Sequence, residues 1–206
     1  MLPRSGEYVV FDVETTGLSA NGGDRIVEIA AIRIKDTIII EEFESFVDPE
    51  RDIPIEAIEV HHITRDMVAD APKASEVLPE FLHFIGGAAV VGHNVRFDIN
   101  FVGFQSAMMG RRIKDVTPAI DTLKMSRFLL PHLTRHTLAH VASYLGIQIN
   151  ETHRALADVA LTVEVFNKLL LLAEDKNINT FKLLHEHFSI NKPTFKIQSA
   201  NQGILF

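Results

Sequence analysis

The order of strand-like and helix-like segments is the feature that most constrains the fold of this chain. Three β-prone runs come first, at residues 8–11, 26–34 and 37–47. Shorter apolar runs then alternate with helical patterns. The later candidate strands are residues 88–91 and 118–121, and the candidate helices are residues 55–68, 75–85, 97–109, 122–130, 137–145, 156–170 and 180–188. We therefore expect an α/β fold whose first three strands are antiparallel.

Composition limits the chemistry that the chain can perform. It has no cysteine, which excludes disulfides, thiolate zinc sites and cysteine nucleophiles. Any metal must be held by carboxylate, imidazole or backbone oxygen groups, and this favours hard cations such as Mg²⁺ or Mn²⁺. The net charge of −7 disfavours a protein that binds nucleic acid mainly by neutralising phosphates. A carboxylate site for cations, however, contributes negative charge itself.

Length and hydropathy predict one catalytic domain without a membrane anchor. The amino-terminal residues lack a basic region followed by a long apolar run, and no stretch reaches the roughly 18 uninterrupted apolar residues that a spanning helix requires. We expect a cytoplasmic protein with no membrane partner. Its organisation is predicted as a catalytic domain at residues 1–174, followed by a helix and tail at residues 175–206.

Two acids, Asp12 and Glu14, stand two residues apart at the end of the first β-prone run. Because side chains alternate along a strand, both carboxylates should project from one face of the sheet. A polar strand end that enters a turn at Gly17 also explains a lone pair of this kind. Charge beside an apolar strand is costly unless a cation lies there, so the pair is a candidate for binding metal.

Two further acids lie near the starts of helices. Asp98 follows the buried run at 88–91, where a first-turn aspartate that caps the helix is the alternative explanation. Asp158 lies near the start of the long helix, opposite its apolar stripe, and His153 precedes it by five residues. A solvated acid and a surface histidine explain these two residues separately. The joint arrangement of all the acids with a histidine favours a functional site.

Together, the four acids and the histidine are the set that two-metal hydrolysis of a phosphodiester needs. Carboxylates can hold two cations about 3.5–4 Å apart, which clamp the attacking and leaving oxygens of an in-line displacement. An imidazole, whose ordinary pKa is about 6.5, suits the removal of a proton from water at neutral pH. The sequence therefore predicts a catalytic site made by Asp12, Glu14, Asp98, Asp158 and His153.

Three segments resemble the exonuclease motifs of the DnaQ-like, or DEDD, superfamily. Phe-Asp-x-Glu-Thr-Thr-Gly at residues 11–17 is similar to the first motif, His-Asn-x-x-Phe-Asp at 93–98 to the second, and His-Arg-Ala-x-x-Asp at 153–158 to the third. The histidine five residues before the last acid resembles the histidine-type, or DEDDh, branch. The resemblance covers about residues 5–172. It is strongest to bacterial proofreading exonucleases, namely the epsilon subunit of DNA polymerase III and the exonuclease domain of PolC-type polymerases.

This resemblance implies an RNase H-like fold, with a central mixed sheet flanked by helices. It also implies two divalent cations, Mg²⁺ or Mn²⁺, and the release of nucleoside 5′-monophosphates from single-stranded or frayed DNA 3′ ends. The resemblance also implies that Thr15 and Phe97 would contact the terminal nucleotide. One segment departs from the pattern, because the His-Gly-Ile-Thr of proofreaders reads His-His-Ile-Thr at residues 61–64. Core packing explains His61 as well as a role near the scissile end does.

Two alternative functions stay open. An exoribonuclease of the same superfamily that trims RNA would carry the same motifs, since these specify phosphodiester hydrolysis and not the sugar. A non-catalytic module that binds nucleic acid or a polymerase is the second alternative. Such a module needs neither all four acids nor the histidine, and the negative net charge disfavours it.

The last residues of the chain resemble the peptide with which bacterial polymerases and repair enzymes dock on the sliding clamp. Gln202 would bind at the rim of the clamp's pocket, while Leu205 and Phe206 would fill its apolar groove. Folding of these side chains back onto the chain's own surface is the alternative. The predicted partners are thus DNA 3′ ends and a sliding clamp or replicative polymerase.

Overall fold

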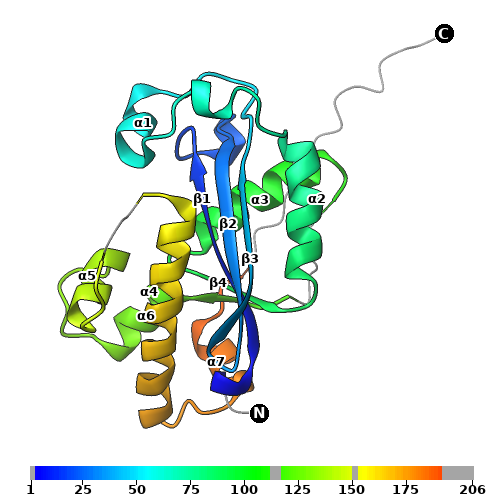
Figure 1. The fold of residues 1–206 in the computed structure, drawn as a ribbon. Coiled ribbons are helices and arrows are strands. Elements are labelled where there is room, and N and C mark those ends of the chain that lie inside the picture. Colours follow the sequence, from blue (N-terminus) through cyan, green and yellow to red (C-terminus); the bar gives the residue numbers. More distant parts are fainter. Residues whose placement is uncertain (1–2, 112–116, 150–152, 192–206) are drawn as a thin grey trace.

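One mixed sheet runs through the part of the chain that this computed structural model describes, residues 3–111, 117–149 and 153–191 (Figure 1). Its strands are β1 (Glu7–Thr15), β2 (Ile26–Lys35), β3 (Ile38–Phe46), β4 (Ala89–Gly92) and β5 (Ala119–Asp121). They lie in the order β3-β2-β1-β4-β5. The pairs β1–β2 and β2–β3 are antiparallel, whereas β1–β4 and β4–β5 are parallel. The expected mixed sheet, with its first three strands antiparallel, is confirmed.

Helices cover both faces of this sheet (Figure 1). They are α1 (Ile55–His61), α2 (Ala74–Ile85), α3 (Arg96–Met108), α4 (Thr122–Leu129), α5 (Leu138–Tyr144), α6 (Ala155–Asp175) and α7 (Phe181–Phe188), with short 3-10 helices η1 (Pro3–Ser5), η2 (Ala20–Gly22) and η3 (Asp66–Val68). The predicted strands are found, and so are the predicted helices other than that at residues 55–68, with ends shifted by one or a few residues in most cases. Among the described helices, none combines the length and low charge needed to cross a bilayer.

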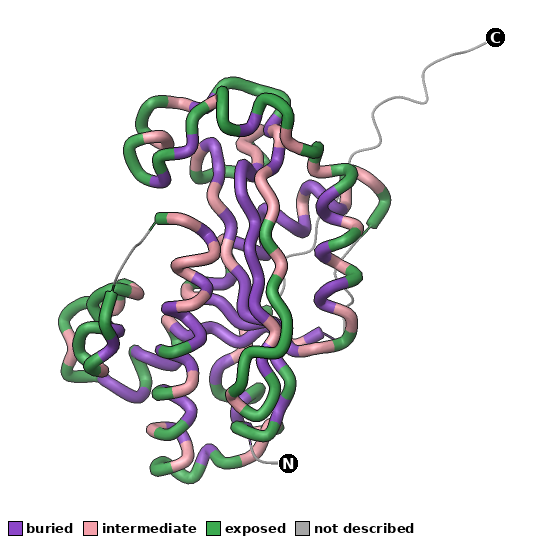
Figure 2. The backbone as a smooth tube through the Cα atoms, in the orientation of Figure 1, coloured by how far each residue is buried: buried purple, intermediate pink, exposed green. Residues whose placement is uncertain are grey.

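β1 lies inside the sheet and divides its side chains between two apolar cores. Tyr8 and Val10 pack with the face covered by α4, α5, α6 and α7. Val9, Phe11 and Val13 pack with the opposite face, beneath α2 and α3. Figure 2 shows the resulting buried centre, while β3 at the sheet edge is largely exposed. The alternation places the even-numbered side chains of β1 towards α6.

The segment predicted as one helical stretch at residues 55–68 is divided in two. α1 ends at His61 because His62 adopts a φ of 61°, which is left-handed and cannot continue a right-handed helix. The N–H of His62 closes the end of α1 by donating to the carbonyl of Ile58. A short 3-10 helix, η3, then follows.

The described end of the chain packs on the same core as the rest. Leu184 and Phe188 of α7 are buried in the core beneath α6. The N–H of Ile190 donates to the carbonyl of Ala119, so the first residues after α7 lie along β5. Most of the predicted tail, residues 192–206, lies outside the described residues. The domain boundary at residue 174 stays a prediction.

Candidate active site

Three of the predicted metal-binding acids meet at the carboxyl end of β1. Asp12 and Glu14 project from the same face of the strand, and α6, which packs on that face, brings Asp158 to them from its first turn. One carboxylate oxygen of each residue lies within 4.8 Å of the other two. The expectation that Asp12 and Glu14 share a face, and that Asp158 turns towards a common site, matches this arrangement.

Asp98 reaches the same place from the other side of the sheet. It lies buried in the first turn of α3, and its Oδ1 accepts a hydrogen bond from the main-chain N–H of Val13 at 3.1 Å. β4 pairs with β1 only as far as Val10, so Asp98 serves as an acceptor for β1 where β4 has ended. The four acids predicted from the sequence therefore surround one end of β1.

The electrostatics of these acids disfavour their simultaneous ionisation. Burial raises the pKa of Asp12 well above its usual range, and repulsion from Asp98, Glu14 and Asp158 adds to this effect. Burial, followed by the charge of Asp158, raises the pKa of Glu14 to about 8. Burial also raises the pKa of Asp158. Clustered hard oxygen donors of this kind fit a hard divalent cation, whose charge offsets their repulsion.

His153 lies directly beside this cluster, at the point where the chain enters α6. Its main-chain N–H donates to Asp158 Oδ2 at 2.9 Å, and its own charge lowers the pKa of Asp158. The residue adopts a φ of 65°, in the left-handed region, and is exposed. An exposed imidazole next to clustered carboxylates is placed where a water could be deprotonated.

The two predicted nucleotide-contacting residues flank the acids. Thr15 ends β1, is buried, and donates its hydroxyl to the carbonyl of Gly17 at 2.6 Å. Phe97 precedes Asp98 in α3, is half-buried, and packs against Phe101 with ring centroids 4.9 Å apart. Their roles in binding a nucleotide stay predictions. Gln202, Leu205 and Phe206 lie outside the described residues.

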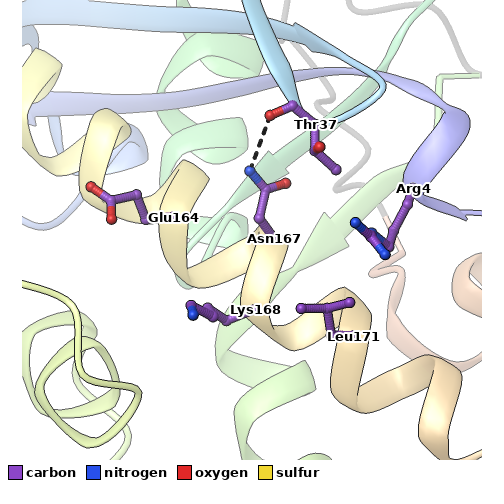
Figure 3. Close-up of a pocket in the computed structure, with 6 residues that line it drawn as sticks. All are labelled: Arg4, Thr37, Glu164, Asn167, Lys168 and Leu171. Carbon is purple, nitrogen blue, oxygen red and sulfur yellow. Dashed lines mark hydrogen bonds between the residues drawn. The ribbon is translucent and has the colours of Figure 1, made fainter.

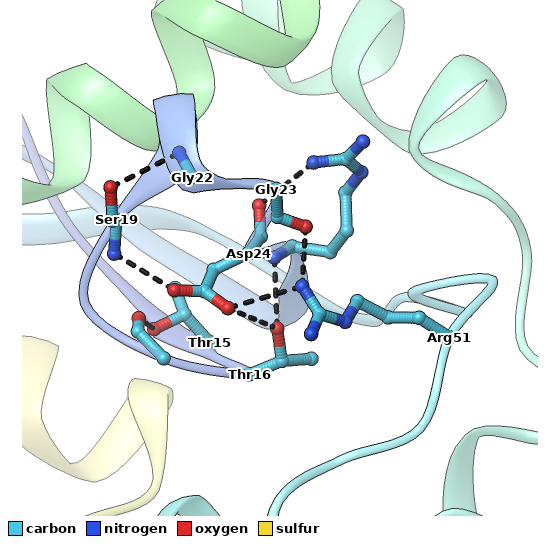
Figure 4. A network of polar contacts seen from close by, with 9 residues as sticks. Thr15, Thr16, Ser19, Gly22, Gly23, Asp24 and Arg51 are labelled. Atoms are coloured by element: carbon cyan, nitrogen blue, oxygen red, sulfur yellow. Dashed lines mark hydrogen bonds and ion pairs between the residues drawn. The ribbon is translucent and has the colours of Figure 1, made fainter.

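Asp24 closes the loop that follows β1 (Figure 4). Its carboxylate accepts hydrogen bonds from the hydroxyl of Thr16 at 3.4 Å and from the N–H of Ser19 at 2.9 Å, and it pairs with Arg51 at 3.1 Å. A Cβ at Gly17 would lie 2.5 Å from this carboxylate, so the loop requires glycine there. Sequence reasoning did not identify Asp24 or Arg51, because their separation along the chain leaves no local pattern.

Sequence reasoning also did not identify Glu28, a carboxylate within the apolar run of β2. Glu28 is fully buried and pairs with Arg154, the residue after His153. An acid inside the otherwise apolar run at residues 26–32 was the available signal. The histidine at position 61 is buried as well, and its Nδ1 accepts a hydrogen bond from the N–H of Ile63 at 3.0 Å. Burial lowers the pKa of His61, and a hydrogen bond with the main chain of Thr15 raises it, so this histidine is buried and also lies beside a predicted site residue. Its role stays a prediction.

The surface pocket in Figure 3 is lined by none of the clustered acids. It has a volume of about 210 Å³ and is lined by Arg4, Thr37, Glu164, Asn167, Lys168 and Leu171. Asn167 follows Asp158 by nine residues, which corresponds to roughly 13 Å along α6 at about 1.5 Å per residue. The pocket therefore contributes no side chain to the carboxylate cluster.

Comparison with known sequences gives an independent description of the chain. A family model described as Exonuclease matches residues 9–166. The chain is 39% identical over 186 residues to a DNA polymerase III PolC-type of Clostridium perfringens (strain 13 / Type A), covering 90% of this chain and 13% of that protein. It is also 39% identical over 180 residues to the DNA polymerase III PolC-type of Bacillus subtilis (strain 168), covering 87% and 12%. The chain thus spans about an eighth of the length of these relatives.

Two solved structures with the same architecture are exonucleases. Exonuclease X in complex with 5′ overhanging duplex DNA superposes with a TM-score of 0.69 at 26% identity, covering 87% of this chain and 98% of that one. E. coli Exonuclease I in complex with a dT13 oligonucleotide superposes with a TM-score of 0.72 at 18% identity, covering 84% and 42%. At that identity the second likeness shows the fold alone. The expected RNase H-like fold is confirmed.

Proposed function

Because this chain belongs to the DnaQ-like exonuclease family, we propose that it is a metal-dependent 3′→5′ exonuclease that acts on DNA. It would hydrolyse the phosphodiester bond at a 3′ end and release a nucleoside 5′-monophosphate. The observation that carries the proposal is the meeting of Asp12, Glu14 and Asp158 within 4.8 Å of one another, beside an exposed His153. Such a set has no evident role in packing a core.

Asp12, Glu14, Asp98 and Asp158 are the residues that would hold two divalent cations, Mg²⁺ or Mn²⁺. When bound, these ions would lower the pKa of the attacking water and stabilise the charge that develops on the phosphate during in-line displacement. The imidazole of His153 accepts the proton as the water oxygen bonds to phosphorus. The bond from phosphorus to the 3′ oxygen of the preceding nucleotide then breaks, and this oxygen takes a proton from solvent to become the new 3′ hydroxyl of the strand.

The proposed substrate is a single-stranded or frayed 3′ end. A terminal nucleotide must leave its partner strand before its phosphate can reach carboxylates that sit at the end of β1. Thr15 and Phe97 flank the acids and are the proposed contacts of that nucleotide. A half-buried Phe97 keeps part of its ring available for stacking, which contributes about 1–3 kcal/mol per base in single-strand sites.

The likeness to PolC-type polymerases supports a role in proofreading or repair, within or beside a replicative polymerase. The relatives are much longer than this chain, so their whole activity and their partners are proposals here. Docking on a sliding clamp through Gln202, Leu205 and Phe206 is a further proposal. Truncation after Ala200 tests it, because loss of binding to the cognate clamp with intact hydrolysis of short oligonucleotides is the expected result.

A single digestion experiment tests the reaction. DNA labelled at its 5′ end is offered as a single strand, as a duplex and as a duplex with a 3′ mismatch, with Mg²⁺, Mn²⁺ or EDTA, and a matched RNA strand is included. Stepwise shortening from the 3′ end of single-stranded and mismatched DNA, abolished by EDTA, is expected. Faster cleavage of RNA would favour the exoribonuclease alternative. Absence of cleavage with either metal would favour the non-catalytic module.

A further inference from the structure

Glu28 is a fully buried carboxylate that joins β2 to the start of α6. Its Oε1 accepts hydrogen bonds from Arg154 Nη2 at 2.7 Å and Nε at 3.1 Å, while its Oε2 accepts one from the main-chain N–H of Ala155 at 2.8 Å. The guanidinium also lies over the ring of Phe46, with 5.2 Å from its central carbon to the centroid. Residues 126 positions apart in the chain are thus fixed to one another.

A buried negative charge at Glu28 is unfavourable, because other carboxylates lie nearby. It pairs in register with Glu14 across β1 and β2, and its charge raises the pKa of Asp12, Glu14 and Asp158. The Arg154 side chain is 40% exposed, and an ion pair with one partly exposed and one buried member is a weak stabiliser. Stability therefore gives little reason for a further acid next to the carboxylate cluster.

The ion pair instead determines how α6 begins. Arg154 is the N-cap residue of α6, and its side chain makes no capping hydrogen bond. Glu28 supplies the missing acceptor, because it binds the otherwise unsatisfied N–H of Ala155. His153 directly precedes Arg154, and the N–H of Asp158 donates to the carbonyl of Arg154 at 3.0 Å. His153, just before α6, and Asp158, in its first turn, thus both depend on the position of Arg154.

We propose that the Glu28–Arg154 ion pair positions Asp158 and His153 for cation binding and proton transfer. Both members are assigned as positioning residues, since their side chains bind each other and the start of α6. The proposal rests on the proposed function, because it assigns these residues a part in the same site. Residues that orient the ligands of a metal typically contribute about 10–100-fold to metal affinity or activity.

An electrostatic role and a positioning role of Arg154 predict different effects on cation binding, so substitutions of Arg154 can distinguish the two roles. Arg154→Gln removes a positive charge beside the acids, so a purely electrostatic role predicts tighter cation binding. A positioning role predicts weaker binding. Arg154→Lys keeps the charge but loses the two-pronged contact with Glu28, so electrostatics predicts no change and positioning again predicts weaker binding. Glu28→Gln keeps the shape of the side chain and removes the ion pair.

The test measures the Mn²⁺ concentration at the midpoint of the cation-induced rise in Tm, in the absence of substrate, together with kcat and KM. Arg33→Gln is the matched control, because Arg33 lies on the same strand and pairs with Glu7 at 2.6 Å, at the opposite end of β2. The double variant Glu28→Met/Arg154→Met keeps the test decisive if a single variant does not fold, since an apolar pair leaves no buried charge unpaired.

We expect the Mn²⁺ midpoint to rise about tenfold or more in Arg154→Lys, Arg154→Gln and Glu28→Gln, with kcat reduced more than KM is raised. Arg33→Gln should lower Tm and leave the midpoint unchanged. The double Met variant should recover part of the Tm without recovering the midpoint, because the N–H of Ala155 still lacks its acceptor. A wild-type midpoint in Arg154→Lys, or a lower midpoint in Arg154→Gln, would overturn the proposal. Failure of the wild type to bind Mn²⁺ at all would instead overturn the proposed function.

Discussion

The Asp98 carboxylate accepts a hydrogen bond from the main-chain N–H of Val13, with 3.1 Å between Oδ1 and the nitrogen. This bond ties the first turn of α3 to β1 beside Asp12, beyond the point where β4 pairs with β1. Burial raises the pKa of Asp98, while the hydrogen bond from Val13 lowers it. The side chain therefore makes two separable contributions, as an acceptor for a buried donor and as a charge for the cation site.

Two substitutions of Asp98 should separate these contributions. Asp98→Asn keeps an acceptor for Val13 and removes the charge, whereas Asp98→Ala removes both. We expect both variants to lose nearly all turnover. Only Asp98→Ala should lower the free energy of unfolding, by about 1–3 kcal/mol, because it leaves a buried N–H unsatisfied. Chemical denaturation in EDTA and digestion of single-stranded DNA measure the two effects. Near-normal turnover in Asp98→Asn would remove Asp98 from the cation site.

Removing one charge from the cluster should stabilise the metal-free protein. Asp12→Asn, Glu14→Gln and Asp158→Asn each relieve repulsion among neighbouring carboxylates, so their Tm in EDTA should equal or exceed that of the wild type. Mg²⁺ should raise the Tm of the wild type and raise that of each variant less. A variant that melts well below the wild type in EDTA would show that its acid serves the core rather than a cation site.

The pH dependence of metal-free stability follows from the raised pKa of Glu14. The ordinary pKa of this group is 4.5, and burial raises it to about 8 in the folded protein. Between these values the folded state binds more protons than the unfolded state, so the free energy of unfolding should fall as pH rises. Below the lower value the group is protonated in both states and contributes no slope.

Thermal unfolding in EDTA across this pH window measures the effect. The fall in Tm should be smaller in Glu14→Gln, and smaller in the wild type with saturating Mg²⁺, because bound cations keep the carboxylates ionised. The raised pKa of Asp12 and of Asp158 acts in the same direction, so part of the slope should persist in Glu14→Gln. An equal slope in wild type and Glu14→Gln would contradict the raised pKa of Glu14.

Local patterns made much of this molecule predictable. Asp12 and Glu14 could be placed on one face because alternate side chains of a strand point to the same side of the sheet. The apolar stripe of α6 likewise showed where this helix starts. The contact of Glu28 with Arg154 could not be read in this way. It joins residues 126 positions apart, and it depends on how α6 packs on β2, which no short window of sequence contains.

The end of α1 shows a second limit. The apolar period continues through residues 55–68, so a single helix was the natural prediction, yet one residue in the left-handed region ends it. The departure of this chain from the His-Gly-Ile-Thr pattern falls on that residue, His62. The glycine of that pattern would suit the backbone of this chain, since glycine has no Cβ to disfavour a φ of 61°.

His62→Gly should therefore stabilise the protein. The exposed His62 side chain holds a left-handed conformation that costs a residue with a Cβ about 1–2 kcal/mol, and the greater freedom of glycine in the unfolded chain offsets part of this. We expect the free energy of unfolding to rise by about 0.5–1 kcal/mol. His62→Ala, which keeps a Cβ, is the control. Equal stability of the Gly and Ala variants would show that the backbone at this position is not strained.

The last prediction concerns His153, which contributes a main-chain N–H and an imidazole that can be tested separately. Its main-chain N–H holds Asp158, and this bond persists whatever the side chain is. Its imidazole is the proposed base, so the rate of the wild type should rise with pH as that imidazole loses its proton. Asn tolerates the left-handed backbone at this position better than Ala does, so His153→Asn removes the base with the least disturbance of the chain entering α6.

We expect His153→Asn to lose about 10²-fold or more in kcat, the usual size of a general-base contribution, and to lose the acidic limb of the rate profile. The Mn²⁺ midpoint of the Tm rise should stay at its wild-type value, because the contact with Asp158 is made by the main chain. This pattern differs from that expected for Arg154→Lys, in which the midpoint itself moves. If His153→Asn keeps the acidic limb of the wild type, then another group takes the proton, and His153 serves only to hold Asp158 through its N–H.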